Sequence, residues 1–503
     1  MPKDEATQPA VHCAKLSSRP PQAPSPRPQA RRKHRAARSR QWRGPRQAAR
    51  SADIGRRSGH EDLRASARSC AWRPCAGRRD GPPGDPPGHL PMTAFPHVSA
   101  DGLRVATPCP VRARNFDALP DRRAAIALLQ QLNARALDPR PVALGDRPLA
   151  LYGAGNLGKL ARGHLDAMGQ SIAFVVDADA ARHRADPDWH GLSILAPEDV
   201  APHVRREALL AIAIANSPFV PIQAELALQG WGACVPFYDL AESFRARHPL
   251  SNGWFSGPLD LSGFAAAATA LEHFADDASR AHYLRFAAWH MAREEWEFAD
   301  APVVPAERFF IPELAATLRA GARFLDGGAH HGSVTARLLE EVRGQVSAVW
   351  AIEPDPANAA VLRDFVAGLD WQVRARVQVL GHVVGARRES VRFHHGLGYA
   401  SQISPTGQSQ RESLPIDALG LDPTYVKLHL EGGELAALEG ARKTLLQHRP
   451  ALAVTVYHNA DGLARTPLWL AQHLENYQLV MRAHAWCGTG AVIYALPKER
   501  MRK

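Results

Sequence analysis

Residues 323–342 read RFLDGGAHHGSVTARLLEEV. A short strand at 323–325 runs into a loop that contains Gly328 and Gly332, and a helix is expected at 333–342. A strand that enters a helix through a glycine-rich turn is typical of parallel α/β units. The stretch therefore predicts an α/β fold.

The same alternation continues toward the carboxyl end. A strand at 347–352 ends on Glu353, 21 residues after Gly332. Further strands are expected at 377–380, 425–430 and 451–457, and a further helix at 435–447. We therefore expect a doubly wound domain over residues 305–503.

An earlier stretch repeats the order of strand, glycines and helix. Residues 148–158 read PLALYGAGNLG, an apolar strand that runs into glycines, and a helix is expected at 159–168. Strands at 171–176 and 208–215 follow. The fold class predicted from both stretches is α/β, with two doubly wound Rossmann-like domains in series, the first over 120–250.

The first glycine-rich loop has the spacing of a dinucleotide-binding fingerprint. Gly153 would make the tight turn, Gly155 would let the backbone approach a phosphate, and Gly158 would let helix and strand pack closely. Asp177, 19 residues after Gly158, would accept hydrogen bonds from ribose hydroxyls. The pattern favours a nucleotide or nucleotide-sugar ligand. A scaffold that binds nothing stays open as an alternative.

The positive charge belongs to one end of the chain. The formal net charge is +11, but residues 1–100 hold 20 Lys and Arg against 7 Asp and Glu, so they alone carry +13. Residues 1–90 contain five Leu, Ile, Val or Phe, too few to bury a core. We expect a disordered tail rich in Arg and Pro over 1–110. Because composition changes at Met92, we expect translation to start there, while a nucleic-acid-binding arm stays open.

Composition excludes several protein classes. No apolar run reaches the roughly 18 residues of a membrane span, and no apolar core of a secretory signal follows the N-terminus. The six cysteines show no Cys-x-x-Cys or zinc-ligand spacing. His394 and His395 are adjacent, but the sequence offers no third metal ligand beside them. We expect a cytoplasmic protein without disulfides or bound metal.

Four short segments of the carboxyl half carry a family resemblance. They are FLDGGA at 324–329, IEP at 352–354, VKLHLEGGE at 426–434 and VYH at 456–458. Together they resemble the FkbM-type methyltransferase family, in which a strand ends in Lys-Ile-Asp-x-Glu-Gly-x-Glu and a Tyr-His pair follows. The resemblance covers about residues 305–497.

The segment between the two predicted domains extends the resemblance. Residues 258–304 form a predicted helical connector, with helices expected at 264–274 and 279–298. Within it, DDASR at 276–280 is similar to a helix start in one FkbM subgroup. Proteins of that kind often carry a Rossmann-like front domain, which agrees with the first half of this chain.

The resemblance implies S-adenosylmethionine as the cofactor. The loop after residue 325 resembles the first motif of methyltransferases that use this cofactor, with Asp326, Gly328 and Gly332 at the matching positions. The glycines would let the loop bend under the cofactor's amino-acid part, and Asp326 would orient the cofactor through water or backbone. Glu353 would accept hydrogen bonds from both ribose hydroxyls.

One residue departs from the family pattern. The strand-end aspartate is His429 here, and an imidazole can accept a proton near neutral pH. The candidate catalytic residues are His429, His458 and Glu431, at the carboxyl ends of neighbouring strands. We expect one of the two histidines to be the base, with Glu431 and Lys427 as anchors of substrate or cofactor.

The resemblance implies O-methylation of a hydroxyl on a sugar, glycan or related metabolite. Two alternatives stay open. One is a non-catalytic nucleotide- or nucleotide-sugar-binding protein whose methyltransferase domain is degenerate at His429. The other is an NAD(P)-dependent oxidoreductase, although no obvious hydride-transfer partner such as Tyr-x-x-x-Lys is present. We expect no specific nucleic-acid partner.

Overall fold

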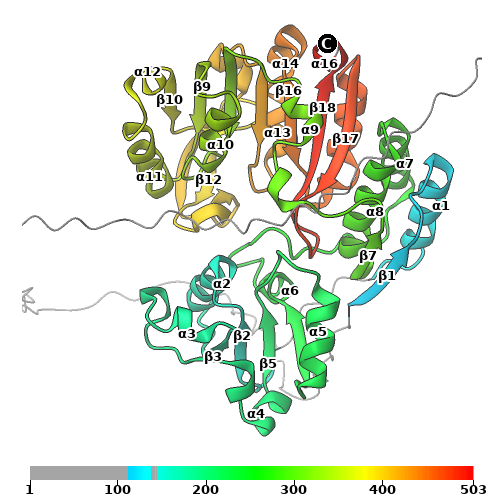
Figure 1. Cartoon of the computed structure of the whole chain (residues 1–503), viewed down its shortest axis with the longest axis vertical. Helices are drawn as coiled ribbons and strands as arrows, with labels where there is room; N and C mark the ends of the chain where they lie inside the picture. The colour runs from blue at the N-terminus through cyan, green and yellow to red at the C-terminus, as the bar shows by residue number, and fades with distance from the viewer. Residues whose placement is uncertain (1–110, 138–141, 143, 502–503) are drawn as a thin grey trace, which may run out of the picture. The chain divides into compact units, whose positions relative to one another are not determined.

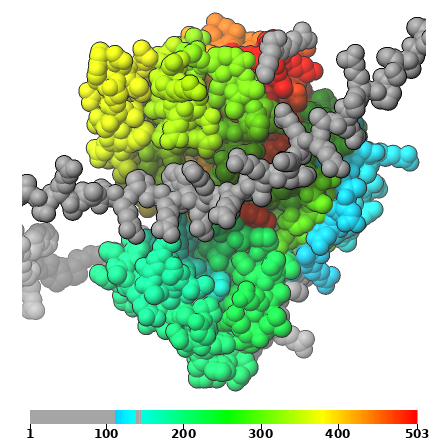
Figure 2. Space-filling model, viewed as in Figure 1, coloured from blue at the N-terminus to red at the C-terminus, as the bar shows by residue number. Residues whose placement is uncertain are grey.

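The computed structural model of the chain describes residues 111–137, 142 and 144–501, and Figure 1 shows the arrangement of its elements. The α/β prediction is confirmed, since parallel sheets alternate with helices. The predicted tail, with Met92, lies outside the described residues. Figure 2 shows the surface of the same elements, coloured along the chain. None of the described helices is long and apolar enough to cross a bilayer.

Five parallel strands form the front sheet, in the spatial order β4-β3-β2-β5-β6. The strands are β2 (Leu149–Tyr152), β3 (Ile172–Val176), β4 (Ile194–Leu195), β5 (Leu209–Ile212) and β6 (Ala233–Pro236). The helices are α2 (Asn156–Ala167), α3 (Ala180–His183), α4 (Pro202–Glu207), α5 (Phe219–Leu228) and α6 (Phe237–Glu242). Leu209 and Leu210 enter two different apolar clusters. Burial of both sheet faces explains the continuous apolar strands in the sequence.

Seven strands form the large sheet, in the order β10-β9-β8-β15-β16-β18-β17. Six of them run in one direction, and β18 runs in the opposite direction between β16 and β17. The strands are β8 (Ala322–Gly327), β9 (Val346–Ile352), β10 (Val377–Leu380), β15 (Tyr425–Leu428), β16 (Ala451–Thr455), β17 (Tyr477–Ala483) and β18 (Ala491–Pro497). The helices around it are α9 (Pro312–Ala315), α10 (Ser333–Glu341), α11 (Pro356–Ala367), α12 (Trp371–Arg374), α13 (Glu434–Glu439), α14 (Arg442–His448), α15 (Arg465–His473) and α16 (Lys498–Met501). A smaller sheet has the order β11-β14-β12-β13, from β11 (Val383–Val384), β12 (Glu389–His394), β13 (Gln402–Ile403) and β14 (Ser409–Leu414).

The connector contains the helices α7 (Leu261–His273) and α8 (Asp277–Ala292). The sequence predicted helix through residue 298, but α8 ends at Arg293, which has a left-handed φ of 50°. The buried guanidinium of Arg293 donates to both carboxylate oxygens of Asp239, at 2.7 and 2.8 Å. This tertiary contact fixes the end of the helix, and residues 294–298 become the strand β7 instead.

The first described elements pack on the connector. The strand β1 (Arg112–Phe116) pairs in parallel with β7 (Glu294–Phe298). The helix α1 (Arg122–Asn133) packs against α8 and contributes Leu129 and Leu132 to an apolar cluster shared with the large sheet. The predicted front domain, residues 120–250, includes this helix, whereas its buried leucines pack with the connector and the large sheet.

The helix predicted at 435–447 is broken into α13 and α14. A Cβ on Gly440, at the break, would lie 2.0 Å from the carbonyl oxygen of Gly385. The Gly440 carbonyl accepts from the backbone N–H of Asp417 at 2.9 Å. The Asp417 carboxylate then accepts from the backbone N–H of Lys443 and of Thr444 at the start of α14. A separate segment of chain therefore ends one helix and caps the next.

We expect Gly440→Ala to lower the free energy of unfolding by about 1–3 kcal/mol, because the new methyl group would overlap a backbone carbonyl. Urea denaturation monitored by circular dichroism measures this change. The matched control is Gly381→Ala, where a Cβ would meet no described atom within 4 Å. Equal stability of the two variants would contradict the close approach.

Candidate active site

One cavity of about 1490 Å³ is lined by residues that follow the carboxyl ends of strands in both sheets. Gly328, Glu353 and His429 line it from the large sheet, and Gly153 and Asp177 line it from the front sheet. Its volume exceeds the roughly 300–1,000 Å³ typical of a pocket for one small molecule. The cavity therefore has room for two ligands side by side.

The glycine loop after β8 presses against a neighbouring strand. Gly328 has a φ of 74°, and a Cβ there would lie 2.0 Å from the carbonyl oxygen of His429. Only glycine fits this position. Gly332, with a φ of 86°, packs against the ring of Phe365, where a Cβ would lie 2.5 Å from Cδ1. The two predicted glycines differ in place, because Gly328 lines the cavity and Gly332 supports the loop from behind.

Asp326 holds this loop from within the protein. Its carboxylate is fully buried, with Oδ1 3.0 Å from the Nζ of Lys427 and Oδ2 accepting from the hydroxyl of Thr335 at 2.8 Å. Lys427 also donates to the carbonyl oxygen of Gly328 at 2.7 Å. Lys427 reaches the cavity, whereas Asp326 acts on the loop through Lys427.

Glu353 and Asp177 are held in the same way in their two sheets. Oε2 of Glu353 accepts from the backbone N–H of His330 at 2.8 Å, and Oε1 accepts from the backbone N–H of Asp355 at 2.9 Å. Oδ2 of Asp177 accepts from the backbone N–H of Ala154 at 2.7 Å, and Oδ1 accepts from the backbone N–H of Asp179 at 2.8 Å. Burial raises the pKa of Glu353, and these backbone donors oppose the rise. Each carboxylate is thus fixed between its glycine loop and the cavity.

The front glycine loop has the tight packing expected of its spacing. Gly153 has a φ of 107°, and a Cβ on Gly158 would lie 2.0 Å from the carbonyl oxygen of Gly153. A Cβ on Gly155 would meet no described atom within 4 Å. Gly153 and Gly155 line the cavity, and Gly158 lies behind them against Gly153.

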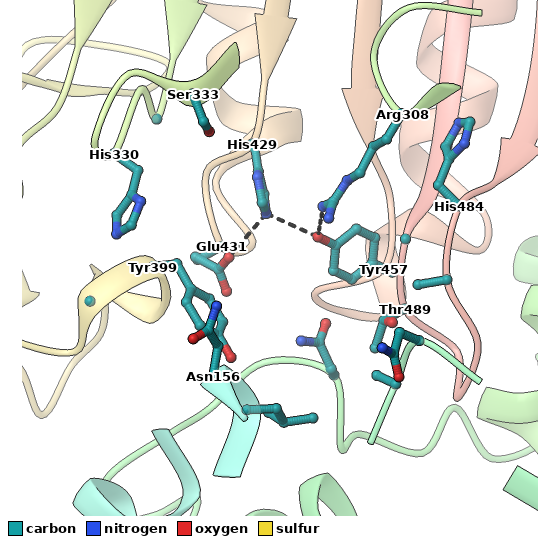
Figure 3. A pocket seen from close by; sticks show the side chains of 18 of the residues that line it. Asn156, Arg308, His330, Ser333, Tyr399, His429, Glu431, Tyr457, His484 and Thr489 are labelled. Atoms are coloured by element: carbon teal, nitrogen blue, oxygen red, sulfur yellow. Dashed lines mark hydrogen bonds and ion pairs between the residues drawn. The ribbon is translucent and has the colours of Figure 1, made fainter. Parts of the chain in front are cut away.

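The three predicted catalytic residues come together. His429 and Glu431 line the cavity, as Figure 3 shows from close by, and His458 is buried behind them. Oε1 of Glu431 lies 3.2 Å from Nε2 of His429 and 3.3 Å from Nε2 of His458. We call His429, Glu431 and His458 the histidine–glutamate cluster. Nδ1 of His458 donates to Oε1 of Glu434 at 2.7 Å, so a second carboxylate holds the buried ring. Glu434, the last residue of the segment VKLHLEGGE, therefore orients His458.

Contacts from distant segments complete the cluster. The hydroxyl of Tyr457 lies 2.9 Å from Nε2 of His429, and Arg308 donates to the same hydroxyl (Figure 3). Ser251, between the front sheet and the connector, donates to Oε2 of Glu431. The sequence did not single out these three residues. Tyr457 precedes His458 in the Tyr-His pair, but no local pattern points to Ser251. Glu431 itself has a left-handed φ of 50°, the kind of backbone strain that often marks functional sites.

Burial and charge act in opposition on the cluster. Burial lowers the pKa of His429 to about 3, and the charge of Arg308 acts in the same direction. Burial also lowers the pKa of His458, but the carboxylates of Glu431 and Glu434 outweigh it and raise this pKa well above its usual value. Burial raises the pKa of Glu431, but the two histidines outweigh it and hold this pKa well below its usual value. The cluster therefore favours a positive charge on His458 and a neutral ring at His429.

Comparison with known proteins gives one family match. Residues 326–479 match the family described as the methyltransferase FkbM domain. No curated protein matches the chain. A solved methyltransferase FkbM from Methylobacillus flagellatus KT is similar, with 21% identity and a TM-score of 0.49, over 75% of this chain and 100% of that one. Precorrin-6y C5,15-methyltransferase from Geobacter metallireducens GS-15 is similar over 39% of this chain and 93% of that one, with 16% identity and a TM-score of 0.24.

The matched range includes the glycine loop, Glu353 and the whole histidine–glutamate cluster. The predicted resemblance and the predicted enzyme class are therefore confirmed. Residues 326–479 form a methyltransferase domain of the FkbM family, a family whose membership implies the use of S-adenosylmethionine.

Proposed function

We propose that this enzyme transfers a methyl group from S-adenosylmethionine to a hydroxyl of a sugar, glycan or related metabolite. The shared cavity carries the proposal. Gly328 and Glu353 line it together with His429 and Glu431, and the front glycine loop lines the same space. One ligand can therefore be held by each sheet, with the cluster in reach of both.

The residues present fit S-adenosylmethionine. Gly328 lines the cavity, and its lack of a side chain lets the loop pack on the carbonyl oxygen of His429, which any Cβ would meet at 2.0 Å. Glu353 offers a carboxylate whose oxygens are fixed by backbone donors, which suits a ribose diol. Gly328 and its loop would hold the amino-acid part of the cofactor, and Glu353 the ribose. When bound, the cofactor supplies a methyl group on a positively charged sulfur.

The chain's own residues must align the acceptor and take its proton. During transfer, a bond forms between the acceptor oxygen and the methyl carbon as the carbon–sulfur bond breaks, and the hydroxyl proton leaves. Alignment alone can contribute on the order of 7–11 kcal/mol, and help with the proton adds roughly 10²–10⁴-fold in rate. Glu431 and His429 line the cavity, so we place the acceptor hydroxyl at the histidine–glutamate cluster.

The front sheet supports a nucleotide-linked acceptor. Asp177 is fixed to its glycine loop by the same pair of backbone contacts that fix Glu353. Asn156 and Asn216 also line the cavity. We infer that Gly153, Gly155 and Asp177 hold the nucleotide part of the acceptor, so that its sugar extends toward the cluster.

Labelled-methyl transfer from S-adenosylmethionine to a panel of sugars, glycans and nucleotide-sugars tests the function. We expect label on a nucleotide-sugar, with isothermal titration showing one cofactor site per chain. Cofactor binding without transfer to any acceptor would favour the non-catalytic alternative. Binding of NAD(P), abolished by Gly155→Val, would favour the oxidoreductase alternative.

A further inference from the structure

We propose that the histidine–glutamate cluster binds a divalent transition-metal ion of the zinc class, with His429, Glu431 and His458 as its ligands. The inference rests on the proposed function, since it names what activates the acceptor oxygen. It reverses our expectation from the sequence that the protein holds no metal.

The distances within the cluster are those between ligands of one ion. One nitrogen or oxygen atom from each of the three residues lies within 4.8 Å of the other two. The separations that involve Oε1 of Glu431 are 3.2 and 3.3 Å. Zinc bonds of about 2.0–2.2 Å to nitrogen and oxygen place neighbouring ligands of a tetrahedron roughly 3.3–3.5 Å apart. Small shifts of these side chains would therefore admit an ion between them.

A second carboxylate orients His458 as in many metal sites. Nδ1 donates to Glu434 at 2.7 Å, and Glu434 also accepts from the backbone N–H of Leu430 at 2.9 Å and the hydroxyl of Thr455 at 2.7 Å. This arrangement turns Nε2 of His458 into the cluster. The side chain of His458 is fully buried, and Nε2 has no hydrogen-bond partner among the described residues. A metal-ligating histidine usually gives its other nitrogen to a carboxylate in this way.

The donor set selects the class of ion. Two imidazole nitrogens and one carboxylate oxygen suit zinc and its first-row neighbours, whereas magnesium prefers oxygen ligands alone. Aspartate at position 429, as in the FkbM pattern that this segment resembles, would give a donor set with one oxygen in place of a nitrogen. The imidazole of His429 therefore favours zinc over ions that prefer oxygen ligands. Methyl transfer consumes no electrons, so a redox-inactive ion is sufficient.

The ion would have one side open to the cavity. His429 keeps 19% of its side chain exposed, whereas Glu431 and His458 are 7% and 0% exposed. The acceptor hydroxyl would bind at the open side and lose its proton to solvent, leaving an oxygen anion held by the ion. That oxygen then forms its bond to the methyl carbon as the carbon–sulfur bond breaks. The Tyr457 hydroxyl, 2.9 Å from Nε2 of His429, is placed to donate to the same oxygen.

Metal binding by the full chain, freed of metal with a chelator, tests the inference without any activity measurement. We expect one Co²⁺ per chain, with visible absorption bands of a low-coordinate site, and displacement by Zn²⁺. Glu431→Gln and His429→Ala should each abolish this binding. Glu434→Gln, which changes only the orienting carboxylate, should weaken it by roughly 10–100-fold. His395→Ala, which alters a histidine outside the cavity lining, should bind as wild type does.

His429→Asp is the most selective variant, because it restores the family's carboxylate. We expect it to bind Mn²⁺ in preference to Co²⁺, the reverse of wild type. Circular dichroism of each variant separates loss of a ligand from loss of fold. Absence of stoichiometric Co²⁺ binding in a folded wild-type chain that still transfers methyl groups would overturn the metal site and leave the function standing. Metal binding without any methyl transfer would overturn the function and leave the site standing.

Discussion

Glu431→Gln is expected to lower the rate of methyl transfer by roughly 10²–10⁴-fold, the usual contribution of groups that remove a proton. Oε1 of Glu431 lies 3.2 and 3.3 Å from the two histidines, so it joins the cluster into one unit. Glutamine keeps the shape of the Glu431 side chain but loses its negative charge. The loss of rate is therefore expected whether the cluster acts alone or through a bound metal ion. Initial rates with labelled S-adenosylmethionine measure the effect.

Cofactor affinity should separate this effect from a general disturbance of the cavity. Glu431 lies at the cluster and Glu353 beside the glycine loop, so Glu431→Gln should bind S-adenosylmethionine about as tightly as wild type. His429→Ala should show the same split, with retained cofactor affinity and reduced turnover. If either variant kept the wild-type turnover, the cluster would have no role in the reaction.

Glu353→Gln should weaken S-adenosylmethionine binding by roughly 10–100-fold, since hydrogen bonds to a charged group contribute about 1.5–3 kcal/mol. Both oxygens of Glu353 accept from backbone N–H groups, at 2.8 and 2.9 Å. A glutamine amide would oppose one of these donors with another donor. The side chain would then leave the position that suits the ribose. Isothermal titration measures the change.

Asp177→Asn is the matched control, because it makes the same change in the same arrangement of the front sheet. We expect it to leave cofactor affinity unchanged and to raise KM for a nucleotide-linked acceptor. Glu353→Gln should therefore weaken binding of the cofactor, and Asp177→Asn should weaken binding of the acceptor. If Asp177→Asn weakened cofactor binding as much as Glu353→Gln, the assignment of one ligand to each sheet would be wrong.

The sequence predicted those residues of the candidate site that belong to local patterns. Glycines and strand-end acids are read from a single stretch of chain, and the structure brings Gly328, Glu353 and Asp177 to one cavity. The same reasoning placed His429 and His458 at neighbouring strand ends, where they lie near each other. Whether these residues bind the proposed ligands stays a prediction.

Long-range contacts were beyond the sequence. Ser251 reaches Glu431 across 180 positions of the chain, and no period or motif encodes that contact. The break in the helix at Gly440 likewise depends on the backbone of Gly385, 55 residues earlier. Asp326 matched a cofactor motif, yet its buried pairing with Lys427 uses its charge to hold the loop. Tertiary packing decided each of these cases.

Methyl transfer by the full chain from labelled S-adenosylmethionine to nucleotide-sugars, compared between wild type and Glu431→Gln, tests the proposed function of the cluster. We expect label on a sugar hydroxyl with wild type, a loss of roughly 10²–10⁴-fold in the variant, and equal cofactor affinity in both. A wild-type chain that neither binds the cofactor nor labels any hydroxyl would contradict the proposed methyl transfer.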